Sequence, residues 1–543
     1  MKMKKLLTNL SQNWKSGLTV SLVSIPLSVS LAVASHASPV MGIVTAVYAG
    51  LVAALFGGSN FNVVGPTGAL SGILATFAIA NGADALPMLA ITSGLIILAA
   101  YFLQLERYLV FVPGGAIHGF TLGVAFIIGL NQLNFALGLS GLTSHEKFIE
   151  NVIESLKHIG AASPTNVSLF GLALIALFAF KKFLPKLPGA IFVAPLGIVI
   201  GILSANHLIP LTIKTLGILY PTMSFSPFLA HPFSLSHNLI GPSLAVALVA
   251  ILETMLSAKV ADGMTKTKHH KQNEMRGLAL ANIASGIMGG LPATAALART
   301  SLNIKTGATD KVSSTISSVS VAIISIFLLG YFKFIPLAVI AAILVYVAIQ
   351  MVETEHFSRM FKYDKKNLIV SLLVATITIV EDPIVGILFG VAVASLLLLE
   401  KLSRGQFDLV LNTNNKMTGR ISGDTIEEIV KDSDTILYSF KGLLCYINSE
   451  AHVERFHKSL NGYKNVILRF RSVYYMDLDG AEALDEIIKL IENQGKNVYL
   501  TSISPIIEEL LSECQSYNKL KDSDRVFAKS SDVLKKLGFK LKT

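Results

Sequence analysis

The stretch that decides the fold reads GGLPATAALARTSLNIKTG and covers residues 289–307. It is apolar, it is broken by a Gly-Gly pair and by Pro292, and it carries one arginine, Arg299. An earlier stretch at residues 57–71, GGSNFNVVGPTGALS, also has a Gly-Gly pair and then a proline, Pro66. Matched Gly/Pro-interrupted segments in two halves of a membrane protein indicate an inverted repeat with a binding site near the bilayer midplane. Either stretch alone is equally well explained by the frequency of Gly and Pro in membrane helices.

The composition places most of the chain in a bilayer. Of its 543 residues, 52% are hydrophobic and only 15% are charged, which is too apolar for a soluble protein of this length. The net charge of +10 could suggest a nucleic-acid partner, but the basic residues lie mostly in short clusters between apolar runs. That is the positive-inside pattern of a protein surrounded by membrane lipid, so no nucleic-acid partner is expected. The two cysteines, Cys445 and Cys514, give no disulfide framework.

Fourteen apolar runs precede residue 402 and predict an α-helical polytopic membrane protein with 14 segments. They lie at about 17–34, 40–56, 66–80, 86–105, 112–130, 167–184, 188–205, 240–260, 277–290, 294–304, 312–332, 335–352, 367–381 and 383–400. The runs at 66–80 and 294–304 are too short to cross a hydrocarbon core that needs about twenty helical residues, so we interpret them as half-helices. The basic residues Lys2, Lys4, Lys5 and Lys15 predict a cytoplasmic N-terminus. The polar stretch near 141–166 predicts a short surface helix in an outside loop.

The last part of the chain, residues 403–543, has a different character. β-rich runs at 435–440, 464–470 and 497–502 are accompanied by amphipathic helical patterns at 449–460, 480–494 and 505–514. Strands that alternate with helices predict a small α/β domain, which we place on the cytoplasmic side. Residues 412–418 are polar and without periodicity, and we expect them in the linker or first loop of this domain.

Glu253 lies inside an apolar span, in the sequence AILETMLSAKVADGM at residues 250–264. A carboxylate at membrane depth is costly, so Glu253 is a candidate proton carrier or cation ligand. Ser257 lies four residues later on the same helical face and could add an oxygen ligand. The alternative is a buried glutamate that bonds to a neighbouring helix.

Arg299 is the second charge inside an apolar segment, and its burial requires a carboxylate partner or an anion. It either pairs with Glu253 or contributes positive field to an anion site. In the second case, the backbone N–H groups of residues 295–298 and 67–69 are the expected direct ligands. The histidines at 269 and 270 lack a spaced ligand set and fit a solvated loop, and His118 has no evident partner in sequence. No metal site and no enzymatic constellation is predicted.

These residues resemble the sulfate permease (SulP) family of anion transporters. The blocks that carry the resemblance are IPLSVSLAVA, FNVVGPTGA, ETMLSAKVADGM and the run from Gly277 to Ala308. Residues 435–514 are similar to the family's C-terminal STAS domain. The resemblance implies a transport domain over 1–402 and a STAS domain over 403–543. It also implies a seven-plus-seven inverted repeat with a core and a gate domain, an elevator-like motion and a homodimer.

The resemblance also assigns site residues. It implies an anion site at Ser28, at Thr67, Gly68 and Ala69, and at Ala295, Ala296 and Leu297, near Arg299. It places the coupling ion, H⁺ or Na⁺, at Glu253 and Ser257. The chain departs from the family pattern at two positions. Ala295 has a methyl group where many relatives have glycine, so we expect a narrower anion pocket. Asp479 precedes Gly480, where stand-alone STAS relatives carry a phosphorylatable serine. The domain is therefore expected to act in assembly or in binding a cytoplasmic protein.

The predicted function is secondary transport of a small anion, namely sulfate, bicarbonate or a dicarboxylate, across the inner membrane. Glu253 would couple inward movement to a proton or a sodium ion. Two alternatives stay open at this stage. One is an uncoupled anion exchanger or channel-like permease, and the other is a membrane-anchored scaffold or sensor that signals through its STAS domain.

Overall fold

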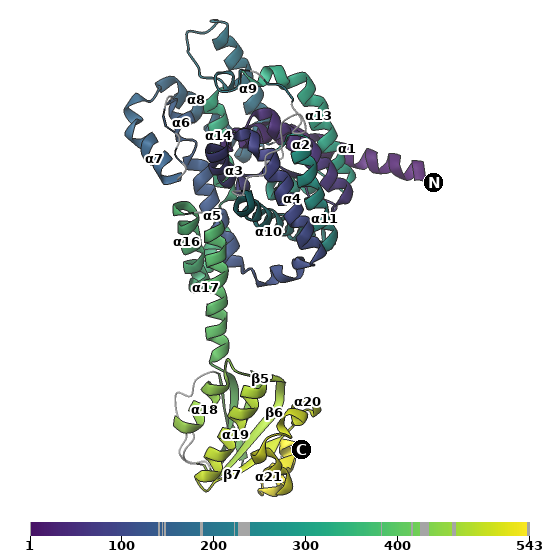
Figure 1. Cartoon of the computed structure of the whole chain (residues 1–543), viewed down its shortest axis with the longest axis vertical. Coiled ribbons are helices and arrows are strands. Elements are labelled where there is room, and N and C mark those ends of the chain that lie inside the picture. Colours follow the sequence, from purple (N-terminus) through teal and green to yellow (C-terminus); the bar gives the residue numbers. More distant parts are fainter. Residues whose placement is uncertain are drawn as a thin grey trace. The chain divides into compact units, whose positions relative to one another are not determined.

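The computed structural model describes residues 2–139, 142–143, 145, 148–184, 188–221, 223–225, 239–381, 383–413, 416–423, 434–458 and 463–539. The chain forms two compact units, Met1–Ala394 and Ser395–Thr543. The first is helical and the second is built on a β-sheet (Figure 1). The predicted class, a helical membrane protein with a small α/β domain, is therefore confirmed.

Each of the fourteen predicted runs falls on a helix. The first seven are α1 (Lys2–Ala34), α2 (Pro39–Phe56), α3 (Gly68–Asn81), α4 (Leu86–Phe102), α5 (Gly114–Leu130), α8 (Pro164–Phe183) and α9 (Ala190–Ala205). The second seven are α10 (Ile240–Thr265), α11 (Lys271–Ile287), α12 (Leu297–Lys305), α13 (Val312–Phe332), α14 (Leu337–Met351), α16 (Lys365–Val380) and α17 (Pro383–Ser403). Within the described residues, nine helices are long and apolar enough to span a membrane. The half-helices α3 and α12 have only 14 and 9 residues.

Helix packing in the two halves follows the same pattern. If α1–α5, α8 and α9 are matched in order to α10–α14, α16 and α17, each main contact has a counterpart. The contact of α4 with α11 corresponds to that of α13 with α2. The contact of α1 with α13 corresponds to that of α10 with α4. The contact of α5 with α16 corresponds to that of α14 with α8. The half-helices follow the rule too, because α12 packs on α1 and α3 on α10. This is the arrangement that a repeat of seven segments predicts.

Among the described residues between the spans are the short α-helices α6 (Leu133–Leu137), α7 (Phe148–Lys157) and α15 (Thr354–Tyr363). The polar stretch near 141–166 contains α7, so the predicted surface helix is confirmed in its described part. α15 has an apolar and a polar face and packs on α16.

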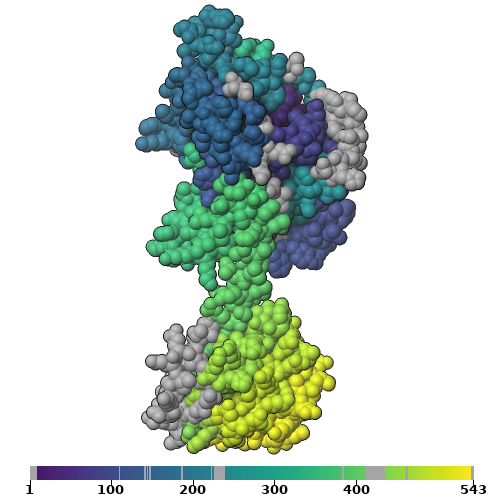
Figure 2. Space-filling model, turned by 60° about the vertical axis from the view of Figure 1, so that its left-hand side comes forward, coloured from purple at the N-terminus to yellow at the C-terminus, as the bar shows by residue number. Residues whose placement is uncertain are grey.

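The second unit contains a six-stranded sheet in the order β4-β3-β5-β6-β7-β8. Its strands are β3 (Gln406–Thr413), β4 (Lys416–Gly423), β5 (Thr435–Leu444), β6 (Asn465–Met476), β7 (Asn497–Thr501) and β8 (Val526–Phe527). The pairs that β3 makes with β4 and β5 are antiparallel, and the remaining pairs are parallel. Its helices are α18 (Ser449–Lys458), α19 (Leu478–Asn493), α20 (Pro505–Leu511), α21 (Gln515–Asp522) and α22 (Ser530–Lys536), and together they form one compact body, light green to yellow in Figure 2.

The three predicted strands and three predicted helices of this unit are present, but the expected loop at 412–418 is wrong in its described part. Those residues belong to the paired strands β3 and β4. The strand-to-helix turn before Gly480 is a helix start, because the Asp477 side chain caps α19 by accepting from the N–H of Gly480 at 2.9 Å. A β-carbon at Gly480 would meet the carbonyl oxygen of Leu444 at 2.2 Å, so glycine allows this close approach.

We expect acid to destabilise the second unit through His452. This side chain is fully buried against Tyr438, and burial lowers its pKa from 6.5 to about 3. The unfolded chain then binds a proton at pH values where the folded chain does not, so stability is full above about pH 6.5 and falls as the pH drops. Between about pH 7 and pH 5 the loss should be on the order of 2 kcal/mol. Thermal unfolding of a 395–543 fragment measures it.

A matched pair of variants isolates this effect. His452→Phe should remove most of the pH dependence of the melting temperature between about pH 7 and pH 5. His457→Phe, at an exposed position on the same helix, should leave it as in the unmodified fragment. Equal pH dependence in all three proteins would refute the role of His452.

Candidate anion-binding site

Two short strands bring the two half-helices together. β1 (Val64–Gly65) pairs antiparallel with β2 (Thr294–Ala295), with Val64 opposite Ala295 and Gly65 opposite Thr294. Each strand leads directly into a half-helix, β1 into α3 and β2 into α12. Because the strands are antiparallel, the half-helices leave the ladder in opposite directions and their N-termini meet near it. The predicted pair of facing half-helices is therefore present.

Buried side chains hold the segment before α12 in place. Asn282 on α11 donates to the carbonyl of Ala293 at 2.9 Å and accepts from the N–H of Ala293 at 2.8 Å. Thr45 on α2 accepts from the N–H of Leu291 at 2.6 Å, and Ser285 donates to the carbonyl of Leu291 at 2.7 Å. Non-helical backbone at membrane depth is tolerated only where its polar groups are paired in this way.

Neither half-helix has a side-chain cap at its N-terminus. The N-cap residues are Thr67 for α3 and Ala296 for α12, and neither makes a capping hydrogen bond. The first N–H groups of a helix have no intrahelical partner, and they lie at the positive end of the helix dipole. The N–H groups that begin at Gly68 and at Leu297 are therefore suited to bind an anion.

The N–H groups of Ala295 and Ala296 are not available for this purpose. That of Ala295 donates to the Thr254 hydroxyl at 3.1 Å, and that of Ala296 donates to the Val63 carbonyl at 3.1 Å. The prediction that these two groups contact the anion directly is wrong for this conformation, and Leu297 is the first residue of α12 that offers one. Ala295 itself is fully buried in a cluster with Val64 and other small side chains.

Glu253 faces the first half-helix. Its Oε2 accepts from the Thr67 hydroxyl at 3.0 Å, and its side chain is only partly buried. Ser257, one turn further along α10, donates instead to the Asn62 side chain and to the Thr300 hydroxyl, at 3.0 Å each. The structure thus places Glu253 at the N-terminus of α3 and Ser257 in a neighbouring hydrogen-bond network.

Arg299 is buried with 2% of its surface exposed and donates a hydrogen bond to the carbonyl of Pro66. It packs against the backbone of Gly65, where a β-carbon would lie 2.8 Å from one guanidinium nitrogen. Within the described residues it makes no ion pair with Glu253 shorter than 4.0 Å. The guanidinium therefore connects the second half-helix to the entry of the first, and its positive charge lies beside both N-termini.

Ser28 on α1 is also buried, and its hydroxyl has no hydrogen-bond partner in the described part of the protein. A buried hydroxyl without a partner costs free energy unless a ligand or water satisfies it. α1 packs against both α3 and α12, so Ser28 lies on a helix that borders the half-helix pair.

Glu274 is a buried carboxylate that the sequence did not single out. Its Oε2 accepts from the N–H groups of Gly58 and Ser59, at 2.6 Å each, and its Oε1 accepts from the Asn62 side chain at 2.6 Å. It lies in the basic tract TKTKHHKQNEMR at residues 265–276, which contains the histidines at 269 and 270 that we assigned to a solvated loop. That interpretation is wrong in part, because His269 is also largely buried and lies 2.8 Å from Asp262. The available signal was the Gly57-Gly58 break that ends α2, because the N–H groups of Gly58 and Ser59 after it need an acceptor.

We expect Glu274→Ala to destabilise the transport unit strongly. The variant would leave two backbone N–H groups and one amide without their acceptor, at a cost on the order of 3 kcal/mol or more. The melting temperature of the purified full chain is the measurement. Glu355→Ala, which removes an exposed carboxylate that pairs with Arg359 at the surface, is the control and should melt as the wild type. Equal melting of both variants would contradict this role.

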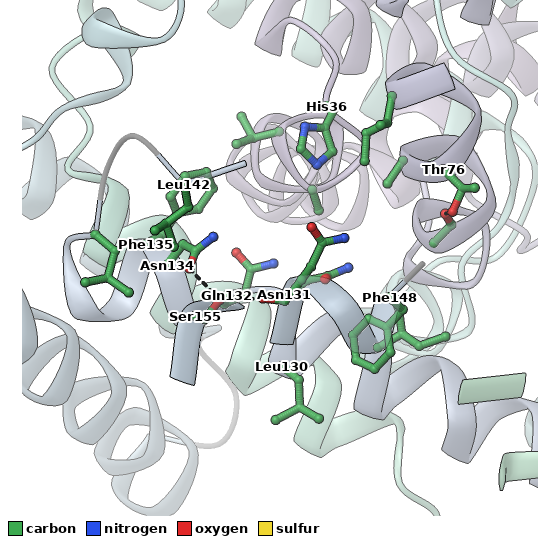
Figure 3. A pocket seen from close by; sticks show the side chains of 18 of the residues that line it. His36, Thr76, Leu130, Asn131, Gln132, Asn134, Phe135, Leu142, Phe148 and Ser155 are labelled. Carbon is green, nitrogen blue, oxygen red and sulfur yellow. Dashed lines mark hydrogen bonds between the residues drawn. The ribbon is translucent and has the colours of Figure 1, made fainter. Parts of the chain in front are cut away.

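A cavity of about 580 Å³ lies beside α3 (Figure 3). Its lining residues include His36, Gly72, Thr76, Asn131 and Gln132. In Figure 3, His36 faces Asn131 and Gln132 across the cavity, and the buried Oε1 of Gln132 has no hydrogen-bond partner within the described residues.

The cavity does not include Gly68. A β-carbon there would lie 2.5 Å from Cδ1 of Ile128 on α5 and 3.3 Å from the sulfur of Met351 on α14. These two side chains cover the N-terminus of α3, so the cavity ends about one helical turn from it.

Residues 10–374 match the sulfate permease family, and residues 427–532 match the STAS domain. The chain belongs to the sulfate permease family. It is 28% identical to the putative sulfate transporter YvdB of Bacillus subtilis over 93% of this chain and 94% of that one. It is 24% identical to the bicarbonate transporter BicA of Picosynechococcus, over 96% of this chain and 93% of that one. Membership makes it a multi-pass membrane protein of a transporter family and not an enzyme.

Solved structures show the same fold. The structure of the murine anion transporter Slc26a9 in an inward-facing state superposes with a TM-score of 0.81 at 15% identity, over 97% of this chain and 91% of that one. The transmembrane domain of a cyanobacterial BicA superposes with a TM-score of 0.60 at 23% identity, over 70% of this chain and 97% of that one.

Proposed function

We propose that this protein is a secondary active transporter of a small anion, which binds where the N-termini of α3 and α12 meet. The observation that supports this most strongly is the β1–β2 ladder, which brings two uncapped half-helices and the buried Arg299 together. The ligands would be the N–H groups of Gly68, Ala69, Leu297 and Ala298, together with the hydroxyls of Thr67 and Ser28.

Sulfate, bicarbonate and a dicarboxylate such as fumarate are the candidate substrates. Relatives named as sulfate and bicarbonate transporters align along nearly the whole chain. A site built from backbone N–H groups binds any small anion through its charge, so it accommodates all three classes.

Glu253 supplies the coupling in this proposal. Its carboxylate bonds to the hydroxyl of Thr67, the N-cap of α3, so its charge acts directly on the anion site. A bound proton or sodium ion would remove the repulsion between this carboxylate and the anion. The anion and the cation would therefore enter together, which makes the transporter a symporter. Ser257, in the network one turn away, would support the cation site.

The wider setting of the proposal is an elevator-like mechanism in a homodimer of the inner membrane. α1–α4 and α10–α13 pack mainly on one another and hold the half-helices, whereas α5, α8, α9, α14 and α16 form a second group. Movement of the first group past the second would uncover the site, which Ile128 and Met351 now cover. We place the N-terminus and the STAS domain, residues 403–543, in the cytoplasm, and the transport domain at 1–402.

Uptake into proteoliposomes tests the function. Labelled sulfate, bicarbonate and fumarate are offered separately to vesicles with the full chain and to protein-free vesicles. Saturable uptake of at least one anion above the protein-free level is expected. Uptake of all three at the protein-free level, with or without a trans anion for exchange, would refute transport of these anions.

We expect Arg299→Gln to weaken anion binding by about tenfold or more, because the positive charge beside both half-helices is lost. A tenfold loss of affinity corresponds to about 1.4 kcal/mol of binding free energy. Arg299→Lys keeps the charge and should recover part of the affinity. Binding of the labelled anion to the purified protein measures both. Wild-type affinity in the glutamine variant would show that this charge does not act on the anion.

A further inference from the structure

Three side chains that no part of the transport mechanism uses come together at the start of α5. Nδ1 of His118, in the first turns of α5, lies 3.0 Å from Oε2 of Glu353, which follows α14. The ring of His356, in the first turn of α15, lies against the His118 ring with centroids 3.7 Å apart. One ligand atom from each of the three residues lies within 4.8 Å of the others. Two histidines and one carboxylate thus converge from segments far apart in sequence.

We propose that His118, Glu353 and His356 bind a divalent first-row transition metal ion, such as Zn²⁺. Imidazole nitrogen and carboxylate oxygen are ligands that Zn²⁺ takes readily, and three protein ligands leave a position for water. The side chains of His118 and Glu353 are 14% and 35% exposed, so an ion can reach them from solvent.

A simple ion pair accounts less well for this cluster. One carboxylate can pair with one protonated imidazole, but a second protonated ring with its centroid only 3.7 Å away would be repelled. Two neutral imidazoles and one carboxylate carry no such repulsion when they share a cation. A shared metal ion would account for both rings beside one carboxylate, and the metal content of the protein distinguishes it from a neutral His356 that only stacks on His118.

The metal would connect the two helices that cover the anion site. His118 lies on α5, which also carries Ile128, and Glu353 lies two residues after Met351, the last residue of α14. α5 and α14 pack on each other. A bound ion would hold the start of α5 to the end of α14 and so restrain the pair that covers Gly68. This consequence for transport rests on the proposed function, whereas the metal site itself does not.

Metal content is the direct test. The full chain is purified without a tag, stripped with a chelator, dialysed against a small excess of Zn²⁺ and analysed by mass spectrometry for zinc per chain. We expect about one zinc per chain in the wild type and a loss of it in His356→Ala and Glu353→Gln. His145→Ala should keep the zinc, because His145 lies near Glu150 without a third ligand in the described part of the chain. Zinc absent from the wild type, or equal in wild type and His356→Ala, would overturn the site.

Two further readouts separate metal binding from folding and from transport. Zn²⁺ should raise the melting temperature of the wild type and not that of His356→Ala, while both melt alike in chelator. A zinc-induced rise of the same size in both would contradict the site. Zn²⁺ should also change the rate of anion uptake in wild type only, and an unchanged rate would overturn its control of the anion site. Absence of all uptake would refute the proposed function, while zinc content still decides the metal site.

Discussion

Glu253→Gln should abolish accumulation of the anion against its gradient. Glutamine keeps the shape of the side chain and an acceptor for the Thr67 hydroxyl, but it neither carries a charge nor takes up a proton. If one proton enters with each anion, a pH gradient of about one unit supplies about 1.4 kcal/mol per anion. This free energy can hold the anion at an inside-to-outside concentration ratio of about ten. In the variant this ratio should fall to about one. Uptake into proteoliposomes with an imposed pH or sodium gradient measures it.

The control for this variant is Asp84→Asn, which removes an exposed carboxylate from the short turn before α4. It should accumulate the anion as the wild type does. Binding of the labelled anion to purified Glu253→Gln distinguishes loss of coupling from loss of the site, because the variant should still bind. If Glu253→Gln accumulates the anion normally and without pH dependence, coupling through this residue is refuted and an uncoupled exchanger becomes the better description.

Gly68→Leu should abolish anion binding. Gly68 is the first residue of α3, and a β-carbon there already lies within 2.5 Å of Ile128 and 3.3 Å of Met351. A leucine would add three more carbons in front of the N–H groups that face the anion. We expect affinity to fall by at least about a hundredfold, which corresponds to about 2.8 kcal/mol.

Gly171→Leu is the matched control, because a β-carbon at Gly171 on α8 meets nothing within 4 Å. It should bind the anion normally. Overpacking at Gly68 can itself cost about 1–3 kcal/mol of stability, so size-exclusion profile and melting temperature are compared for both variants. A folded Gly68→Leu protein with wild-type affinity would place the anion site elsewhere.

The sequence allowed the helical frame to be predicted because its signals are local. Apolar runs separated by basic clusters indicate spans, and the short runs at 66–80 and 294–304 beside Gly/Pro breaks indicate the half-helices that became α3 and α12. The cost of burying a carboxylate or a guanidinium directed attention to Glu253 and Arg299, both of which lie at the half-helix pair.

The features that the sequence did not predict are contacts between residues that are far apart in the chain. The β1–β2 ladder is only two residues long on each side, too short for a periodic strand pattern. The N–H groups of Ala295 and Ala296, which we had assigned to the anion, donate instead to the Thr254 hydroxyl and to the Val63 carbonyl. Glu274 lies in a hydrophilic tract, and only the fold shows that it accepts from Gly58 and Ser59. The partners of His118 are far away in the chain and join it only when α5 packs on α14.

The measurement that tests the anion site most directly is a reconstruction of the full chain by electron cryo-microscopy in a saturating concentration of the transported anion. The anion should appear between the N-termini of α3 and α12, within hydrogen-bond distance of the N–H groups of Gly68 and Leu297, with the Ile128 and Met351 side chains displaced. Anion density confined to another place, such as the cavity beside Gln132, with Ile128 and Met351 still over Gly68, would contradict the half-helix site.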